Sequence, residues 1–150
     1  MRHYGHPPGI AVGSVFRDRR ALSRAGVHPP PRGGISGSST EAADSIVLAG
    51  DYEDDDDRGD EILYTGQGGR DARTGAQIRD QTKNRGNAAL ALSLERGTPV
   101  RVTRRVEGPA GYRYDGLYRV VDLWTEIGRS GFLILRFRLV ALGTTPVDHP

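Results

Sequence analysis

A dense block of carboxylates between two tyrosines is the part of this sequence best suited to chemistry. Residues 51–61 hold eight of the 19 acidic residues and one of the 21 basic residues, and Tyr52 and Tyr64 bracket them. Carboxylates this close together repel one another, so each must either face water or be engaged by a partner. Two flat rings with a carboxylate between them form a slot for a planar ligand that carries an amino group.

Simpler explanations exist for the same acids. A loop whose carboxylates all face water is the simplest of them. A calcium-binding EF-hand with its glycine at Gly59 would begin at Asp54 and would need an acceptor at Arg58 and a glutamate at Thr65, so that motif fails twice. A loose Mg²⁺ cluster, and with it a metal-dependent nuclease that uses the 51–61 loop, stays open as the alternative.

Other enzyme classes find little support in the composition. The only lysine, Lys83, follows Gln81 at the spacing where a restriction-type nuclease needs an acid, and it lacks the context of a GxxxxGK[ST] phosphate loop. The chain has no cysteine, and its four histidines are scattered rather than clustered with asparagine as an HNH nuclease requires. We therefore expect a binding domain without catalytic residues, metal ligands or a cofactor.

Outside the acidic block the chain is strongly basic. The remaining residues carry 20 bases against 11 acids, and nearly all of the bases are arginine. Arginine can be common simply because a genome is rich in G and C, but its rigid donor fork also suits phosphates and base edges. The Gly- and Arg-rich segment 66–79 presents Arg70, Arg73 and Arg79. A basic body with a local acidic pocket is typical of a nucleic-acid binder that reads one amino-bearing base.

Length and hydropathy predict one domain. The chain has 150 residues, which is enough to bury a core, and no apolar stretch approaches the length of a membrane span. We expect residues 1–142 to form the domain and residues 143–150 to be a tail or linker. With no membrane span and no apolar signal region, the sequence predicts a cytoplasmic protein, or a nuclear one in a eukaryote.

Alternating and apolar runs predict more strand than helix. In the run 132–142, every second residue from Leu133 to Ala141 is apolar and is expected to face the core. We expect an α+β domain, a curved barrel-like β-sheet with two packed helices. The predicted strands are Ala11–Phe16, Ile46–Ala49, Ile62–Thr65, Pro99–Val106, Tyr114–Ile127 and Phe132–Leu142, and the helices are Arg19–Ala25 and Asp80–Leu94.

Seven stretches of the chain occur in the order seen in one known family. They are YGHPPGIAVGSVF from Tyr4, AGVHPPPRGGISGSS from Ala25, IVLAGDYEDDDDRGDEILYTGQGGRD from Ile46, DQTKNRGNAALALS from Asp80, PVRV from Pro99, RYDGLYRVV from Arg113 and SGFLILRF from Ser130. Together they resemble the SRA (SET- and RING-associated) domain, also called YDG after a triplet that is here Tyr114-Asp115-Gly116. The likeness covers nearly the whole chain and implies the SRA/PUA-like fold.

The resemblance implies a DNA-binding module that flips 5-methylcytosine, or 5-hydroxymethylcytosine, out of the duplex. Tyr52 and Tyr64 match the family's stacking aromatics, and Asp55 matches the carboxylate that accepts from the exocyclic amine of the base. The rest of the pocket wall is matched by Thr65 and by the backbone at Ala49, Gly50 and Asp51. This assignment agrees with the slot inferred from the tyrosines and acids.

Two loops depart from family members specialised for hemimethylated CpG. Arg32 stands in the VHPPPRGG loop where those members insert a small apolar residue, and the second insertion loop is the shorter Ala72–Arg79. Candidates to contact DNA are Arg32, Arg70, Arg73, Gln77 and Arg79. The expected partner is therefore double-stranded DNA with modified cytosine, and the choice between hemi- and fully modified DNA stays open. Bacterial SRA domains often precede an HNH nuclease and direct restriction of modified DNA, so an HNH domain or partner, and a homodimer, are left open.

Overall fold

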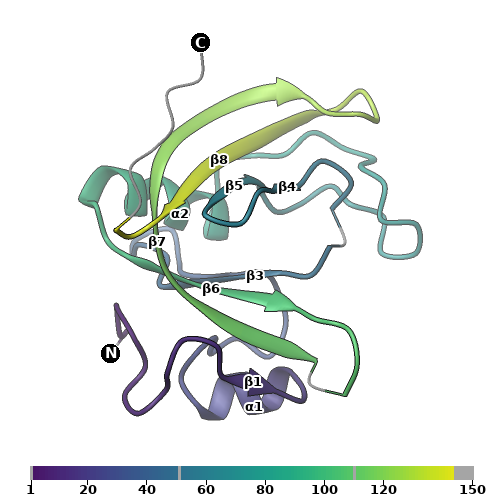
Figure 1. The fold of residues 1–150 in the computed structure, drawn as a ribbon. Coiled ribbons are helices and arrows are strands. Elements are labelled where there is room, and N and C mark those ends of the chain that lie inside the picture. The colour runs from purple at the N-terminus through teal and green to yellow at the C-terminus, as the bar shows by residue number, and fades with distance from the viewer. Residues whose placement is uncertain (1, 51, 110, 144–150) are drawn as a thin grey trace.

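The computed structural model describes residues 2–50, 52–109 and 111–143, which form one curved sheet with two helices (Figure 1). The order along the sheet is β2-β3-β6-β7-β8-β5-β4, with β1 paired to β7. The strands are β1 (Val15–Phe16), β2 (Ile35–Ser36), β3 (Ser45–Leu48), β4 (Asp56–Asp57), β5 (Glu61–Thr65), β6 (Val100–Arg105), β7 (Tyr112–Ile127) and β8 (Leu133–Ala141). The expected α+β fold with a curved sheet is confirmed. Within the described residues β2 and β4 end the path and do not pair, so the sheet stays open there.

Strand β7 makes the sheet curve. Its first half pairs with β6 and its second half with β8, and the register shifts between Val120 and Asp122. An extra residue in one strand of a pair bends that strand and increases its twist. Gly116 lies in the first half with φ of +99°, a conformation that a side chain would strain. The two irregularities let one long strand serve both halves of the sheet (Figure 1).

The main core lies between the sheet and helix α2 (Arg85–Arg96). Ala89 and Leu90 of α2 are fully buried against apolar residues of β3, β5, β6, β7 and β8. Leu135, Phe137 and Leu139 face this core as predicted. The opposite face of β8 is covered as well, because Ile134, Arg136 and Val140 are also buried. No described helix is long and apolar enough to cross a bilayer.

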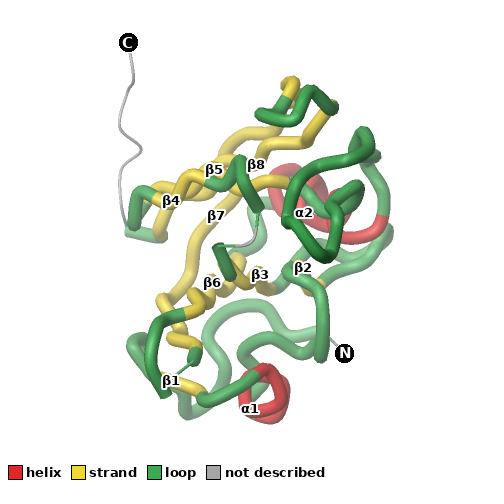
Figure 2. The backbone as a smooth tube through the Cα atoms, turned by 90° about the vertical axis from the view of Figure 1, so that its right-hand side faces the viewer, coloured by secondary structure: helices red, strands yellow, loops and turns green. Residues whose placement is uncertain are grey.

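Helix α1 (Arg19–Arg24) closes a smaller core at the other end of the molecule (Figure 2). Asp18 is the N-cap of this helix, and its carboxylate accepts a hydrogen bond from the Ala21 amide. Leu22 packs with Val27 and Tyr114, all three fully buried. The second core therefore fastens α1, and the loop that follows it, to β7.

Two predicted elements are shorter in the structure. The first strand contains only Val15–Phe16, because residues 11–14 form a turn closed by the Ser14 amide on the Ala11 carbonyl at 3.1 Å. Helix α2 begins at Arg85 rather than Asp80, since Asp80 and Gln81 extend beside β8 and accept the Leu133 and Leu135 amides at 2.8 and 2.9 Å. The predicted tail lies outside the described residues apart from Gly143.

Arg85 is the one described non-glycine residue with positive φ, at 46°. An L-residue other than Asn or Asp in this left-handed region is strained. We expect Arg85→Asn to raise the free energy of unfolding by about 1 kcal/mol, measured by urea denaturation. Arg96→Asn, at the other end of α2 and with negative φ, is the control. If Arg85→Asn raises the free energy of unfolding no more than Arg96→Asn does, backbone strain at Arg85 is contradicted.

Candidate nucleic-acid interface

A cavity of about 200 Å³ lies at the opening of the sheet, between the β2–β3 edge and the β4–β5 edge. It is lined by Arg19, Gly33, Gly34, Val47, Ala49, Tyr52, Asp55, Tyr64, Gln67 and Arg70. Figure 2 shows β4 and β5 above β3 and β2. The cavity thus joins both predicted tyrosines, Asp55 and Ala49. Gly50 borders a neighbouring cavity, and Asp51 lies outside the described residues.

Tyr64 forms a wall of the cavity and is also part of the main core. Its side chain is only 2% exposed. The hydroxyl reaches from β5 across the opening to the carbonyl oxygens of Gly34 and Val47, at 3.3 and 3.4 Å. A Cβ atom at Gly34 would lie 2.6 Å from that hydroxyl, so this close approach needs glycine. Burial raises the pKa of Tyr64 well above its usual value, which keeps the hydroxyl a neutral donor.

Asp55 places its carboxylate against the end of β5. The Thr65 amide donates to Asp55 Oδ1 at 2.7 Å, and Thr65 itself is buried behind the cavity. Burial raises the pKa of Asp55 to about 6, opposed by hydrogen bonds from Thr65 and by the Arg136 guanidinium. A carboxylate has about four acceptor sites, so the bond to Thr65 leaves capacity for a further donor. Asp55 can therefore accept from a ligand inside the cavity.

Tyr52 supplies a flat surface on the other side of the cavity. Its ring is half-buried, and the Arg70 guanidinium carbon lies over it, 4.9 Å from the ring centroid. Burial raises the pKa of Tyr52, while the cation at Arg70 works against that rise. A guanidinium over an aromatic face is a cation–π contact. Tyr52 is thus available for stacking with a planar, electron-poor group.

The acidic block is not a solvated loop, and that simplest explanation is wrong. Asp57 is paired with Arg104 of β6 at 2.6 Å, and Glu61 with Arg138 of β8 at 2.8 Å. Others accept from backbone or hydroxyl groups: Glu53 from Ser130 Oγ at 2.6 Å and Asp54 from the Arg129 amide at 3.1 Å. The carboxylates point to partners on different elements. Within the described residues no group of three acids or histidines could hold a metal ion.

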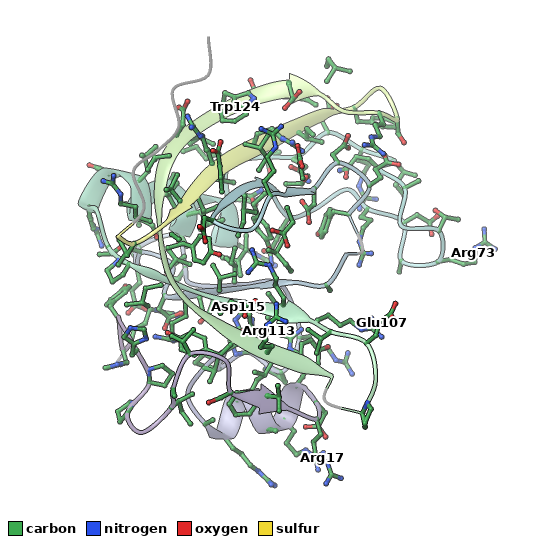
Figure 3. All side chains as sticks on the ribbon, viewed as in Figure 1. Arg17, Arg73, Glu107, Arg113, Asp115 and Trp124 are labelled. Carbon is green, nitrogen blue, oxygen red and sulfur yellow. The ribbon has the colours of Figure 1, made fainter. Side chains whose placement is uncertain are left out.

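The five predicted DNA contacts comprise three exposed arginines, the half-buried Arg70 over Tyr52, and one buried residue. Arg32, Arg73 and Arg79 are exposed, and Arg73 extends from the far tip of its loop (Figure 3). Gln77 is only 4% exposed, and its amide nitrogen donates to the carbonyls of Gly68 and Arg79 at 2.7 and 2.9 Å. The Gln77 side chain therefore holds the loop together, and a DNA contact at this residue stays a prediction.

His28 determines the shape of the proline-rich loop. Its ring is fully buried, with Nε2 3.1 Å from the Gly33 carbonyl oxygen and Nδ1 2.7 Å from Ser45 Oγ. A carbonyl only accepts, so Nε2 must donate and Nδ1 must accept from the serine hydroxyl. Burial lowers the pKa of His28 to about 3, which keeps this neutral tautomer at ordinary pH. The Gly33–Gly34 wall of the cavity is thereby joined to β3.

Arg19 and Gln67 are lining residues that the sequence did not reveal. The Arg19 guanidinium donates to the Gly33 carbonyl at 2.7 Å and ties α1 to the cavity. With its amide oriented to match its neighbours, Gln67 accepts from the Gly34 and Ile35 amides at 3.3 and 3.2 Å.

The triplet Tyr114-Asp115-Gly116 supports the fold and does not line the cavity. The Tyr114 hydroxyl is 2.7 Å from His6 Nδ1, and the side chain is fully buried in the smaller core. Asp115 accepts from Arg104 at 2.9 Å and also pairs with Arg113, its neighbour on β7 (Figure 3). Through Arg104 the triplet is linked to the acidic block.

Two relatives match more than nine-tenths of this chain. The E3 ubiquitin-protein ligase UHRF1 of Rattus norvegicus is 43% identical over 170 residues, which cover 96% of this chain and 22% of that protein. The histone-lysine N-methyltransferase family member SUVH9 of Arabidopsis thaliana is 41% identical, with 92% and 23% covered. The chain spans about a fifth of the length of these relatives.

Solved structures show the same fold. The modification-dependent TagI restriction endonuclease aligns with a TM-score of 0.87 and 45% identity, over 95% of this chain and 53% of that one. The SUVH5 SRA domain bound to fully hydroxymethylated CG DNA aligns with a TM-score of 0.83 and 37% identity, over 99% of both chains. The SAD/SRA domain family model matches residues 3–144. The protein therefore belongs to the SAD/SRA domain family.

Proposed function

We propose that this chain binds duplex DNA containing 5-methylcytosine or 5-hydroxymethylcytosine and takes the modified base, flipped from the stack, into the cavity at the sheet opening. The observation that carries the proposal is the juxtaposition of the Tyr52 ring and the Asp55 carboxylate in one cavity. The cavity has a volume of about 200 Å³, which is smaller than the sites of about 300 Å³ or more that bind drug-sized ligands. That size favours a single base.

Asp55 supplies selectivity for cytosine. The N4 amine of cytosine donates, whereas thymine has an acceptor, O4, at the same position. With its pKa near 6, Asp55 is an ionised acceptor at pH 7.5. Burying a carboxylate without a salt-bridge partner destabilises a fold, and such groups occur preferentially at functional sites. The raised pKa supports a ligand-binding role for this side chain.

The balance of energies is favourable for base extrusion. Taking a base from the duplex costs a few kcal/mol, and stacking on an aromatic ring returns about 1–3 kcal/mol. The exposed Arg32, Arg73 and Arg79 can neutralise phosphates, which adds affinity that falls with salt. The SUVH5 SRA domain, a relative of similar length, has been crystallised with fully methylated and with fully hydroxymethylated CG DNA. These complexes support double-stranded modified DNA as the partner.

We further propose that the chain directs a nuclease to modified DNA, as a specificity domain without cleavage of its own. The similarity to the modification-dependent TagI restriction endonuclease, of which this chain covers 53%, supports this role. The test is incubation of the chain with methylated and plain plasmid and Mg²⁺ or Mn²⁺. Nicking would instead favour a metal-dependent nuclease built on the 51–61 acids.

A binding titration tests the main proposal. Dissociation constants are measured at one salt concentration for otherwise identical duplexes with cytosine, 5-methylcytosine or 5-hydroxymethylcytosine. We expect tighter binding to at least one modified duplex than to the plain one. Equal constants for all three duplexes would overturn the proposal.

The stacking role of Tyr52 has a direct test. We expect Tyr52→Ala to weaken binding to modified DNA by about 1–3 kcal/mol and to leave the fold intact, because the ring is half-buried at the cavity. Tyr64→Ala is unsuitable, since Tyr64 belongs to the core and its truncation should cost about 3–5 kcal/mol of stability. Tyr52→Phe keeps the ring and is the control. Unchanged affinity in folded Tyr52→Ala would remove the stacking model.

Discrimination should depend on Asp55. Asp55→Asn replaces one acceptor oxygen with a donor group and should reduce the preference for 5-methylcytosine over thymine by about 1–3 kcal/mol. Asp56→Asn is the control, because Asp56 pairs only with the exposed Arg58 at 2.8 Å. Asp57 cannot serve, since it holds Arg104. The measurement is the ratio of dissociation constants for two duplexes that carry 5-methylcytosine or thymine at the same position. An equal fall in both variants would mean that the block acts only as bulk charge.

The Asp55→Asn variant should also be more stable than the wild type at neutral pH. A folded-state pKa near 6, above the ordinary 3.8, means that the folded protein holds this proton more tightly than the unfolded chain. The contribution of Asp55 to stability is therefore present at low pH and is lost as pH rises from about 4 to about 6. We expect Asp55→Asn to gain about 1–3 kcal/mol in urea unfolding at pH 7.5, and little at pH 4. A loss of stability at pH 7.5 would refute this.

A further inference from the structure

Arg70 lies on the ring face that a flipped base would need. Tyr52 borders two neighbouring cavities, the base cavity and a second one lined by Leu48, Asp57 and Arg104 among others. Arg70 lines only the base cavity. Its guanidinium is 4.9 Å from the Tyr52 ring centroid, a stacking distance for a cation on an aromatic face. Arg70 therefore covers Tyr52 from inside the base cavity.

The backbone that holds Arg70 is fixed, so only its side chain is free to leave. Residues 70 and 77 form an antiparallel bridge, and the Gln77 amide reaches Glu53 Oε1 at 3.4 Å. The buried Gln77 side chain also binds the carbonyls on both sides of the bridge, Gly68 and Arg79. In the described part of the chain no carboxylate lies within ion-pair distance of Arg70. The cation is thus held mainly by the tyrosine.

We propose that Arg70 is a placeholder, which an entering base displaces from Tyr52 and which then binds a phosphate beside the extruded nucleotide. This inference rests on the proposed function. A base and a guanidinium cannot both stack on one face of one ring, so entry of the base must release the cation. Arg70 lines the cavity and is half-buried, so its side chain can reach solvent. The nearest anions there in a complex are the phosphates that flank the flipped nucleotide. Occupation of the pocket thereby adds one phosphate contact.

The consequence is a preference for modified DNA that depends on salt. A complex with plain DNA leaves Arg70 on Tyr52, and a complex with a flipped base gains one more neutralised phosphate. Each phosphate contact changes the slope of log K against log salt by about 0.9. The slope should therefore be steeper for the modified duplex than for the plain duplex by about 0.9.

The first experiment measures these slopes by titration of 5-methylcytosine and plain duplexes at several salt concentrations. Arg70→Ala, and Arg70→Gln as a second variant of similar length, should remove the difference between the slopes. Arg79→Ala is the matched control from the same loop. It should make the salt slopes of both duplexes less steep and leave the difference between them unchanged. Two results would overturn the proposal. One is equal salt slopes for the two duplexes in a wild type that still prefers modified DNA. The other is a difference between the slopes that remains in both Arg70 variants.

The second experiment removes phosphates from the ligand. Binding of the nucleoside 5-methyl-2′-deoxycytidine is followed by NMR chemical-shift titration of each variant. Without a cation to displace, Arg70→Ala should bind the nucleoside about two- to fivefold more tightly, which corresponds to one exposed cation–π contact. Weaker or unchanged binding would show that Arg70 is not a competitor of the base. Failure of the proposed function looks different: the wild type would not distinguish the duplexes and would not bind the nucleoside.

Discussion

The pocket depends on a cation buried beneath it. Arg136 of β8 is only 6% exposed and lies opposite Thr65 of β5 in the ladder. Its guanidinium donates to Thr65 Oγ1 at 3.1 Å and to the Asp54 carbonyl, and it pairs with Glu126 at 3.0 Å. A buried guanidinium destabilises a fold unless its donors are used. Here the two hydrogen bonds from Arg136 Nη1 fasten the acidic loop to the sheet, which brings Asp55 next to the Thr65 amide.

The open edge of the sheet explains why the site lies where it does. A closed barrel would fill the space between β2 and β4 with a ladder of hydrogen bonds, whereas this sheet leaves a cavity there. Tyr64 spans the opening with its hydroxyl, and Arg104 joins the acidic hairpin to β6 and β7 through Asp57 and Asp115. The arginines therefore have two roles: those under the acidic block hold the scaffold together, and the exposed ones remain for phosphate.

Local patterns in the sequence were enough to predict much of the fold and the centre of the site. The alternation in 132–142 identified the core face of β8, and the short spacing between Tyr52 and Asp55 kept them in one cavity. Contacts between distant residues were not predictable, because the order of strands decides them: Arg104 meets Asp57 although 47 positions separate them. The same holds for Gln77, whose burial follows from the folding of its loop on Gly68 and Arg79.

The choice of an aspartate at position 55 follows from what the pocket must reject. Thymine carries the same 5-methyl group as 5-methylcytosine, so a niche for the methyl cannot separate the two bases; only the group at C4 differs. An asparagine could accept from N4 of cytosine, but by turning its amide it could also donate to O4 of thymine. An ionised carboxylate can only accept, so it repels O4, and specificity of this kind comes from the unfavourable contact as much as from the favourable one. The destabilising burial of Asp55, moderated by Arg136 and Thr65, is the physical counterpart of that exclusion.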